Sequence, residues 1–477
     1  MSLLNMIFPT PAQSKSEKTL FGDFLKAFPV YKTTQALDQW RDDEYPQLKK
    51  TGQVYLDFTG ANLFAKSLVK QHMQLLENGI YGNPHSTNPA SQLSTKLADE
   101  ARKYVLKYFH AGDEYFCIFT PNASGALKIV GEGYPFNSES FLLLSLDNHN
   151  SVNGIREFAQ QKGSAFQYTP LNNDSLYLDK TALQQNLKAH PDKKNKLFAF
   201  PAQSNVSGIK HPLSYITLAK ENGWDVLLDA AAFVPSDILD LRDVKPDFVS
   251  ISFYKIFGYP TGIGCLLMRK DIFNKVIKPW YAGGTITLSA ASYQGHFLKE
   301  NEERFEDGTI NYLNIPAVKI GLQQIEQIGM ENIKARVNCL AMWLIEKLSA
   351  LQHSNHKKMV NIFGAKEAAK RGGTIVMNFY NSEGDVIPFW QIEEAANKKN
   401  ISIRTGCFCN PGLDETNNHI STIDLQHYFG TRKNGDYFEM INVTNKLRGS
   451  VRVSLGLVSN FNDVNSFYQF AQNFLDV

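Results

Sequence analysis

Six short apolar runs, separated by stretches with helical spacing, constrain the fold of this chain more than any other feature of its sequence. They lie at 115–120, 140–146, 196–202, 224–231, 247–253 and 262–269. A strand that is apolar on both sides is buried on both faces, which is typical of a mostly parallel sheet covered by helices. We therefore predict an α/β fold.

The pattern changes in the last third of the chain. One helix is predicted over 315–328, and a second where apolar residues recur every three or four positions from Ile333 to Leu348. Further strands are predicted at 374–380 and 450–456. This part of the sequence therefore indicates a smaller α+β unit.

We predict three parts of the chain from these patterns. Residues 1–49 would form an N-terminal segment that packs on the small domain, 50–310 the large domain, and 311–477 the small C-terminal domain. The polar segment 413–449 shows little periodicity, so we expect a long surface excursion there.

Composition excludes several classes of function. The net charge is +2 and no long block of like charges occurs, which argues against a nucleic-acid or membrane-surface role. No apolar run is long enough to span a bilayer, and the first residues lack the basic start of a secretory signal. The five cysteines provide no disulfide framework and favour a reducing compartment, so we expect a cytoplasmic protein.

Polar residues follow three neighbouring predicted strands at the points where these strands end. Gln203 and Ser204 follow one strand, Asp229 the next and Lys255 the third. Ligands of open parallel sheets bind outside the carboxyl ends of the strands, so these residues predict a site. Taken singly, each has a simpler explanation: a lysine after a strand is usually solvated, and an aspartate there usually caps the following helix.

Five stretches carry a stronger signal than any single residue. They are "FPAQSNVSG", "VLLDAAAFVP", "VSISFYKIFGYPTGIGCLL", "RTGCFCNPG" and "GSVRVSLGLVSNF". In this order they resemble the class V aminotransferase family of pyridoxal phosphate (PLP) enzymes, in its cysteine desulfurase branch. Over about 50–477 the chain is most similar to the N-terminal domain of the molybdenum cofactor sulfurase family. The resemblance implies fold type I, with a mostly parallel seven-stranded sheet and a smaller C-terminal α+β domain.

The resemblance implies a role for each residue at the strand ends. Lys255 would form the Schiff base with PLP, and a nearby cation would lower the pKa of its amine and make it nucleophilic. Asp229 would lie against the pyridine nitrogen and keep the ring protonated, so that the ring can act as an electron sink. Gln203 would donate a hydrogen bond to the ring hydroxyl, and His149 would stack on the ring.

A phosphate site is implied where a predicted helix opens. Ala123 and Ser124 match the family's phosphate loop, and backbone N–H groups at a helix N-terminus bind phosphate well. Ser252 matches a second phosphate contact. Thr309, in "RFEDGT", matches a residue that reaches the phosphate of the other subunit, which implies a homodimer.

Two cysteines stand one residue apart in "RTGCFCNPG". A zinc site needs about four ligands and this stretch supplies two, so we predict no metal site. A disulfide between them would close a short, strained ring in a reducing compartment. The surrounding glycines, asparagine and proline indicate an exposed loop. Packing roles are expected for the other three cysteines, Cys117, Cys265 and Cys339.

In the desulfurase branch, a loop cysteine takes sulfur from L-cysteine as a persulfide, and alanine is released. Laid on "RTGCFC", the family pattern places this nucleophile at Cys409, and leaves Cys407 as a resolving or relay thiol or as a residue without a role. Arg404 is a nearby cation that would favour the thiolate. Arg452 matches the arginine that binds the substrate carboxylate, to which a guanidinium can donate two parallel hydrogen bonds. The expected partners are therefore an amino acid substrate and an unidentified sulfur acceptor.

The chain departs from the family pattern at several positions. Tyr254 stands where desulfurases commonly have a histidine, Phe58 replaces a polar residue in "LDFTGAN", and Leu413 and Asp414 follow "CFCNPG" where a third cysteine is common. The sequence ends soon after the Arg452 strand, so sulfur delivery to molybdenum cofactor is not expected from this chain alone. Two alternatives stay open: a transamination or lyase reaction on another amino acid, and a partner-binding protein that has lost catalysis.

Overall fold

The computed structural model describes residues 17–477. Residues 1–16 lie outside the described residues. The prediction that the chain lacks a secretory signal concerns these residues, and so does the first part of the predicted 1–49 segment. Within residues 17–477, no helix has both the length and the apolar character that crossing a lipid bilayer requires.

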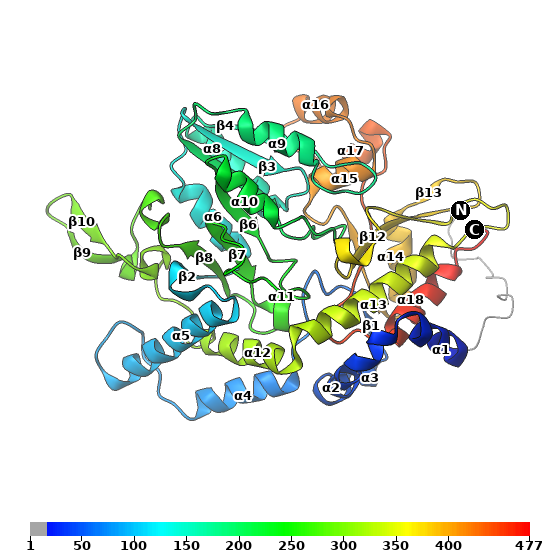
Figure 1. Cartoon of the computed structure of the whole chain (residues 1–477), viewed down its shortest axis with the longest axis horizontal. Helices are drawn as coiled ribbons and strands as arrows, with labels where there is room; N and C mark the ends of the chain where they lie inside the picture. The colour runs from blue at the N-terminus through cyan, green and yellow to red at the C-terminus, as the bar shows by residue number, and fades with distance from the viewer. Residues whose placement is uncertain (1–16) are drawn as a thin grey trace.

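A seven-stranded sheet forms the centre of the molecule (Figure 1). Its strands, in chain order, are β2 (Tyr115–Thr120), β3 (Ser140–Ser145), β4 (Ala165–Thr169), β5 (Asn195–Pro201), β6 (Asp225–Asp229), β7 (Phe248–Ser252) and β8 (Gly264–Arg269). Their spatial order is β2-β8-β7-β6-β5-β3-β4, with β3 to β7 paired in parallel and β8 antiparallel to both of its neighbours. The predicted α/β fold is confirmed.

Each strand of this sheet sends alternate side chains to opposite faces, because successive residues of a strand point in opposite directions. In β5, Phe198 and Phe200 join one apolar cluster, whereas Leu197 and Ala199 join another. Strand β4 was not among the apolar runs because it lies at the sheet edge, where most of its side chains are at least partly exposed.

Helices cover both faces of the sheet, and others build the remainder of the chain (Figure 1). Around the large sheet they are α4 (Lys66–Glu77), α5 (Pro89–Tyr108), α6 (Ala123–Gly133), α7 (Asn150–Asn153), α8 (Ile155–Gln161), α9 (Lys180–Lys188), α10 (Ser214–Glu221), α11 (Tyr254–Phe257) and α12 (Ile315–Ile328). Helices α6 and α8 pack on the face that holds Leu197, while α5, α9 and α10 contribute to the cluster on the face that holds Phe198.

A second sheet of antiparallel strands lies in the C-terminal part of the chain. Its order is β11 (Val360–Ile362), β12 (Thr374–Tyr380), β16 (Ser450–Ser454) and β15 (Arg404–Gly406), with β13 (Val386–Ile387) paired to β12. Around it lie α13 (Met330–Ser349), α14 (Phe389–Lys398) and α18 (Phe461–Gln472). The N-terminal helices α1 (Glu17–Ala27), α2 (Ala36–Glu44) and α3 (Pro46–Thr51) lie beside α13 and α18 (Figure 1). Strand β1 (Val54–Tyr55) pairs with β14 (Ile401–Ser402).

The segment 413–449 contains more regular structure than its sequence indicated. It forms most of α15 (Pro411–Asn417), then α16 (Thr422–Gly430) and α17 (Tyr437–Thr444), which enclose a small apolar cluster of their own. Helices this short show no clear periodicity, and they are marked instead by side chains that cap their first turns, such as those of Ser421 and Asp436.

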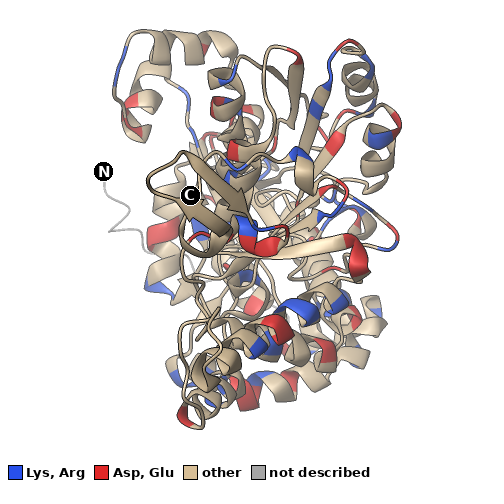
Figure 2. Cartoon of the chain, turned by 90° about the vertical axis from the view of Figure 1, so that its left-hand side faces the viewer, with Lys and Arg blue, Asp and Glu red and all other residues tan. Residues whose placement is uncertain are grey.

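A hairpin of β9 (Ile286–Ala290) and β10 (Gly295–Leu298) projects from the body of the molecule (Figure 1). On the face shown in Figure 2, basic and acidic residues are interspersed, in keeping with the small net charge of the chain.

Candidate active site

One cavity lies at the carboxyl ends of β5, β6 and β7 and gathers most of the residues that the sequence singled out. Its lining includes Ala123, Ser124, His149, Gln203, Asp229, Ser252 and Lys255. Of the remaining predicted residues, Arg404 and Arg452 act on the cavity through their charges, and Cys409 lies on an adjoining loop. Thr309 instead lines a separate hollow with Thr120, and this hollow shares Gly262 with the cavity.

Lys255 projects from α11, the single helical turn that follows β7. Within residues 17–477 its ammonium forms no ion pair or hydrogen bond. Burial lowers the pKa of Lys255 most strongly, the charge of Asp229 opposes this shift, and Arg452 and Arg404 lower the pKa further. The site therefore favours the neutral, nucleophilic amine.

Asp229 is the last residue of β6, and the protein forms hydrogen bonds to only one of its two carboxylate oxygens. Its Oδ1 accepts hydrogen bonds from the Ala231 N–H at 3.1 Å and from the Ser250 hydroxyl at 2.9 Å. Its Oδ2 has no hydrogen-bond partner within residues 17–477. One carboxylate oxygen is thus oriented by the protein and the other is left for a positively charged or N–H group.

His149 caps α7, and this role fixes the position of its proton. The Nδ1 atom accepts a hydrogen bond from the Ser151 N–H at 3.1 Å, so a neutral ring carries its hydrogen on Nε2. Burial lowers the pKa of His149, with Asp229 opposing and Lys255 and Arg452 adding to the decrease. The ring is therefore kept neutral, which suits stacking on another aromatic ring.

Hydroxyl and backbone N–H groups collect where α6 begins. The Ser252 hydroxyl accepts a hydrogen bond from the Ala123 N–H at 2.9 Å, and the hydroxyls of Ser124 and Ser151 lie 2.6 Å apart. A helix N-terminus carries partial positive charge and attracts anions. This end of the cavity could hold a phosphate group.

Gln203 lies at the wall of the cavity with one polar atom unused. Its Nε2 donates a hydrogen bond to the Ala232 carbonyl at 2.9 Å, while its buried Oε1 has no partner within residues 17–477. Gly372 makes room for this side chain, because a Cβ atom there would lie 2.3 Å from Oε1. An unpaired buried polar atom is costly, so a polar ligand group would stabilise this site.

The cysteine loop joins β15 to α15. Phe408 and Cys409 both adopt left-handed backbone conformations, with φ of 56° and 55°. The Cys409 carbonyl accepts a hydrogen bond of 2.7 Å from the N–H of Asn150, the residue that follows His149. Cys409 is exposed, whereas Cys407 is half-buried, and burial, together with the charge of Asp414, raises the pKa of Cys407. Cys409 is thus the more accessible thiol, and its backbone is tied to the cavity wall.

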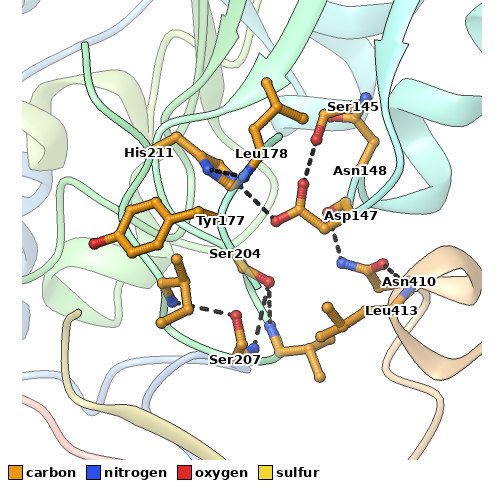
Figure 3. Close-up of polar contacts among 12 residues, drawn as sticks. Ser145, Asp147, Asn148, Tyr177, Leu178, Ser204, Ser207, His211, Asn410 and Leu413 are labelled. Atoms are coloured by element: carbon orange, nitrogen blue, oxygen red, sulfur yellow. Dashed lines mark hydrogen bonds and ion pairs between the residues drawn. The ribbon is translucent and has the colours of Figure 1, made fainter. Parts of the chain in front are cut away.

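A buried polar network anchors the end of this loop (Figure 3). The Asn410 side chain donates hydrogen bonds to the Asp147 carbonyl at 2.6 Å and to Asn205 Oδ1 at 3.1 Å, and accepts one from the Leu413 N–H. Behind it, the Asp147 carboxylate accepts hydrogen bonds from the Ser145 hydroxyl and from His211 Nε2, the latter at 2.8 Å. Asp147, His211 and Asn410 are all buried, so the loop rests on a rigid base.

Arg452 lies on β16 and is 2% exposed. Its Nη2 donates to Asp57 Oδ1 at 2.6 Å, its Nη1 donates to the Asn205 carbonyl at 2.9 Å, and its guanidinium carbon lies 5.0 Å from the centre of the Phe408 ring. The Asn205 side chain in turn donates to the Phe408 carbonyl at 2.9 Å. The arginine therefore contacts the cysteine loop directly and through Asn205.

Sequence reasoning missed three residues that hold this site together: Asp57, Asn205 and Asn410. Asn410 could have been found, because an asparagine directly before a proline matches the start of a helix. Asp57 lies in "LDFTGAN", and no sequence pattern there marks an aspartate whose partners are two distant arginines.

Comparisons with known proteins agree with this geometry. The family model for aminotransferase class-V matches residues 54–467. Molybdenum cofactor sulfurases of Oryza sativa subsp. japonica and Homo sapiens are each 35% identical to the chain, over 92% and 91% of its length, and the chain spans 58% and 51% of theirs.

Among solved structures, the apo cysteine desulfurase of Thermococcus onnurineus NA1 superimposes with a TM-score of 0.74 at 23% identity, covering 90% of this chain and 96% of that one. The cysteine desulfurase CsdA of Escherichia coli gives 0.73 at 18% identity, with 91% and 97% covered. These two proteins share the fold described above.

Proposed function

Because the chain belongs to the aminotransferase class-V family, we propose that it is a PLP-dependent, cysteine desulfurase-like enzyme that holds sulfur as a persulfide on Cys409. One observation carries this proposal: the cavity lined by Lys255, Asp229 and His149 adjoins a loop with an exposed cysteine. The curated relatives are named as sulfurases and the similar solved structures as cysteine desulfurases, which supports the same reaction class.

The residues of the cavity fit PLP. Lys255 offers an amine of lowered pKa, Asp229 a free carboxylate oxygen for the pyridinium nitrogen, and Gln203 a polar atom without a partner. The hydroxyls and N–H groups at the start of α6 suit the phosphate. When bound, PLP would supply an electron sink for the negative charge that develops at the α-carbon of the substrate.

The chain's own residues would carry out the remaining steps. Arg452 would bind the substrate carboxylate, and Lys255 would take up the α-proton and return a proton to the product. The Cys409 thiolate would attack the substrate sulfur, so that the Cβ–Sγ bond breaks and an S–S bond forms. L-cysteine and one thiol give alanine and one persulfide, which balances atoms and electrons.

A homodimer is part of this proposal. Thr309 lines a hollow beside the cavity and not the cavity itself, which leaves it available to a second copy of the chain. The hairpin exposes Leu288, Tyr293 and Phe297, which are 61%, 77% and 68% exposed, and such an apolar surface favours burial against a partner. We place the protein in the cytoplasm, as its few free cysteines favour.

A sulfide assay tests the reaction. The protein, supplied with PLP, L-cysteine and a thiol reductant, should release sulfide and alanine. Without the reductant, mass spectrometry should find one added sulfur atom on the peptide that contains Cys409. Replacement Cys409→Ala should lower sulfide release at least about tenfold, while Cys407→Ala serves as the matched control and should retain it.

The same assay separates the alternatives. Undiminished sulfide release by Cys409→Ala would remove the persulfide assignment. Turnover of another amino acid without sulfide would favour a transaminase or lyase. A protein that develops no visible cofactor absorbance with added PLP, in wild type as in Lys255→Ala, would favour a non-catalytic partner protein.

A further inference from the structure

The carboxylate of Asp57 bridges the two arginines nearest the cavity. Its Oδ1 accepts from Arg452 Nη2 at 2.6 Å and its Oδ2 accepts from Arg404 Nε at 2.9 Å. The bridge is built into the fold, because a Cβ atom at Gly60 would lie 2.4 Å from Oδ2. The backbone on each side of Asp57 is also fixed, since Leu56 is hydrogen-bonded to both Ser402 and Ser454, and the Phe58 N–H donates to the Ser454 carbonyl.

The segment that carries Asp57 also contacts the helix that carries Lys255. Asn62 is 6% exposed, its side chain donates to the Ile256 carbonyl at 2.8 Å, and its N–H donates to the Tyr254 carbonyl. The charges of Asp57, Arg404 and Arg452 all act on Lys255. Asp57 is therefore part of the electrostatic environment of the cavity.

Arg452 retains a donor for one more anion. A guanidinium has five N–H groups. Of these, Nη2 serves Asp57 and Nη1 serves the Asn205 carbonyl, while the buried Nε has no partner within residues 17–477. This unpaired N–H is the donor that would take one ligand carboxylate beside Asp57.

The balance of charge then decides which substrates fit. Two arginines and one aspartate leave a net charge of +1, which a single substrate carboxylate neutralises. A second carboxylate on the substrate would meet only Arg404, whose charge is offset by its ion pair with Asp57 at 2.9 Å, and it would be repelled by Asp57. Replacing Asp57 by a neutral residue would release Arg404 as a second anion partner.

We propose that Asp57 determines substrate class in this site by admitting amino acids with a single carboxylate, such as cysteine, and rejecting those with an acidic side chain. The inference rests on the proposed function, in which Arg452 binds the substrate carboxylate. In this proposal the charge of Asp57, and not the shape of the pocket, determines which amino acids bind.

The test compares L-asparagine with L-aspartate, which have nearly the same shape and differ by one negative charge. Dissociation constants of both are measured with the PLP-loaded protein by calorimetry and by the change in cofactor absorbance, so that turnover is not required. Wild type should bind asparagine more tightly. In Asp57→Asn, the ratio of the two constants should move toward aspartate by about tenfold or more.

Three further variants make the result specific. Asp57→Glu keeps the charge and should keep the preference for asparagine. Asp463→Asn removes another buried aspartate that pairs with an arginine, Arg41 at 2.7 Å, and should leave the ratio unchanged. Arg404→Gln removes a half-exposed cation and should move the ratio further against aspartate, which keeps the proposal testable if Asp57→Asn does not fold.

An unchanged ratio in both Asp57→Asn and Arg404→Gln, or an equal loss of affinity for both ligands, would overturn the specificity role while leaving the proposed function intact. If neither amino acid binds the wild-type protein, the amino acid site itself is wrong, and both proposals fail.

Discussion

Replacing Asn410 by alanine tests whether the buried network positions Cys409. The Asn410 side chain caps α15 and makes two further buried hydrogen bonds, to the Asp147 carbonyl and to Asn205. Loss of an N-cap costs about 1 kcal/mol, and loss of each buried amide bond about 1 kcal/mol net. Asn410→Ala should therefore remove about 3 kcal/mol of local anchoring.

This loss is comparable to the strain that the anchoring opposes. Phe408 and Cys409 adopt consecutive left-handed conformations, and each such residue costs on the order of 1–3 kcal/mol unless its surroundings hold it. Without Asn410 the loop should leave this conformation, and the hydrogen bond from the Asn150 N–H to the Cys409 carbonyl should break.

The assay follows the loop and the chemistry separately. In Asn410→Ala, amide hydrogen exchange at Asn150 and Leu413 should accelerate, and sulfide release should fall, while binding of PLP stays near the wild-type level. Asn410→Asp keeps an acceptor for the cap but sets a buried carboxylate oxygen against the Asp147 carbonyl and Asn205 Oδ1, so its effect should be at least as large. Ser421→Ala, which removes the cap of α16 alone, is the matched control and should leave Asn150 protected. Unchanged exchange at Asn150 in Asn410→Ala would refute the anchoring role.

Three further predictions concern the cavity and the expected dimer. Burial lowers the pKa of Lys255, so at neutral pH folding must either bury its charge or release its proton, and this lowers the free energy of unfolding. The effect fades as the pH rises toward 10.5, the ordinary pKa of a lysine, because the unfolded chain then loses the same proton. Cofactor-free Lys255→Met should therefore unfold at higher denaturant than wild type at neutral pH, with the difference shrinking in alkali; a constant or growing difference would contradict this. Gly372→Ala should displace Gln203 and weaken PLP binding about tenfold, as measured by absorbance titration, and unchanged affinity would exclude Gln203 as a cofactor contact. Leu288→Glu on the exposed hairpin should shift the protein toward monomer in light scattering, and a persistent dimer would place the interface elsewhere.

The strands and the cavity residues were predictable because both depend on local sequence. A strand that is buried on both faces consists of consecutive apolar residues, so the sequence predicts it directly. The carboxyl ends of parallel strands meet at one edge of the sheet, which brings Gln203, Asp229 and Lys255 together. Strand β4 escaped prediction because its edge position leaves its side chains partly exposed. The helices of 413–449 escaped because each is too short for a periodic pattern.

The anchoring network was invisible for a different reason. His211 is bonded to a carboxylate 64 positions away, and Asn410 to a carbonyl 263 positions away. The asparagine before Pro411 indicates a helix cap, but no pattern in one sequence identifies a partner that lies in another element. Even so, the consequences of such contacts are large, because buried polar groups that lose a partner pay the full cost of desolvation.

Arg452 shows how this difference changes a functional interpretation. In the sequence Arg452 is a cation between apolar residues, which predicts a guanidinium that binds a substrate carboxylate. In the structure the same guanidinium already holds the carboxylate of Asp57, which arrives from nearly 400 positions earlier in the chain. Under this proposal, binding of an amino acid depends on how many negative charges the two arginines can neutralise, and not only on the presence of an arginine. Because that number depends on Asp57, a residue that need not touch the substrate can decide which amino acids the site accepts.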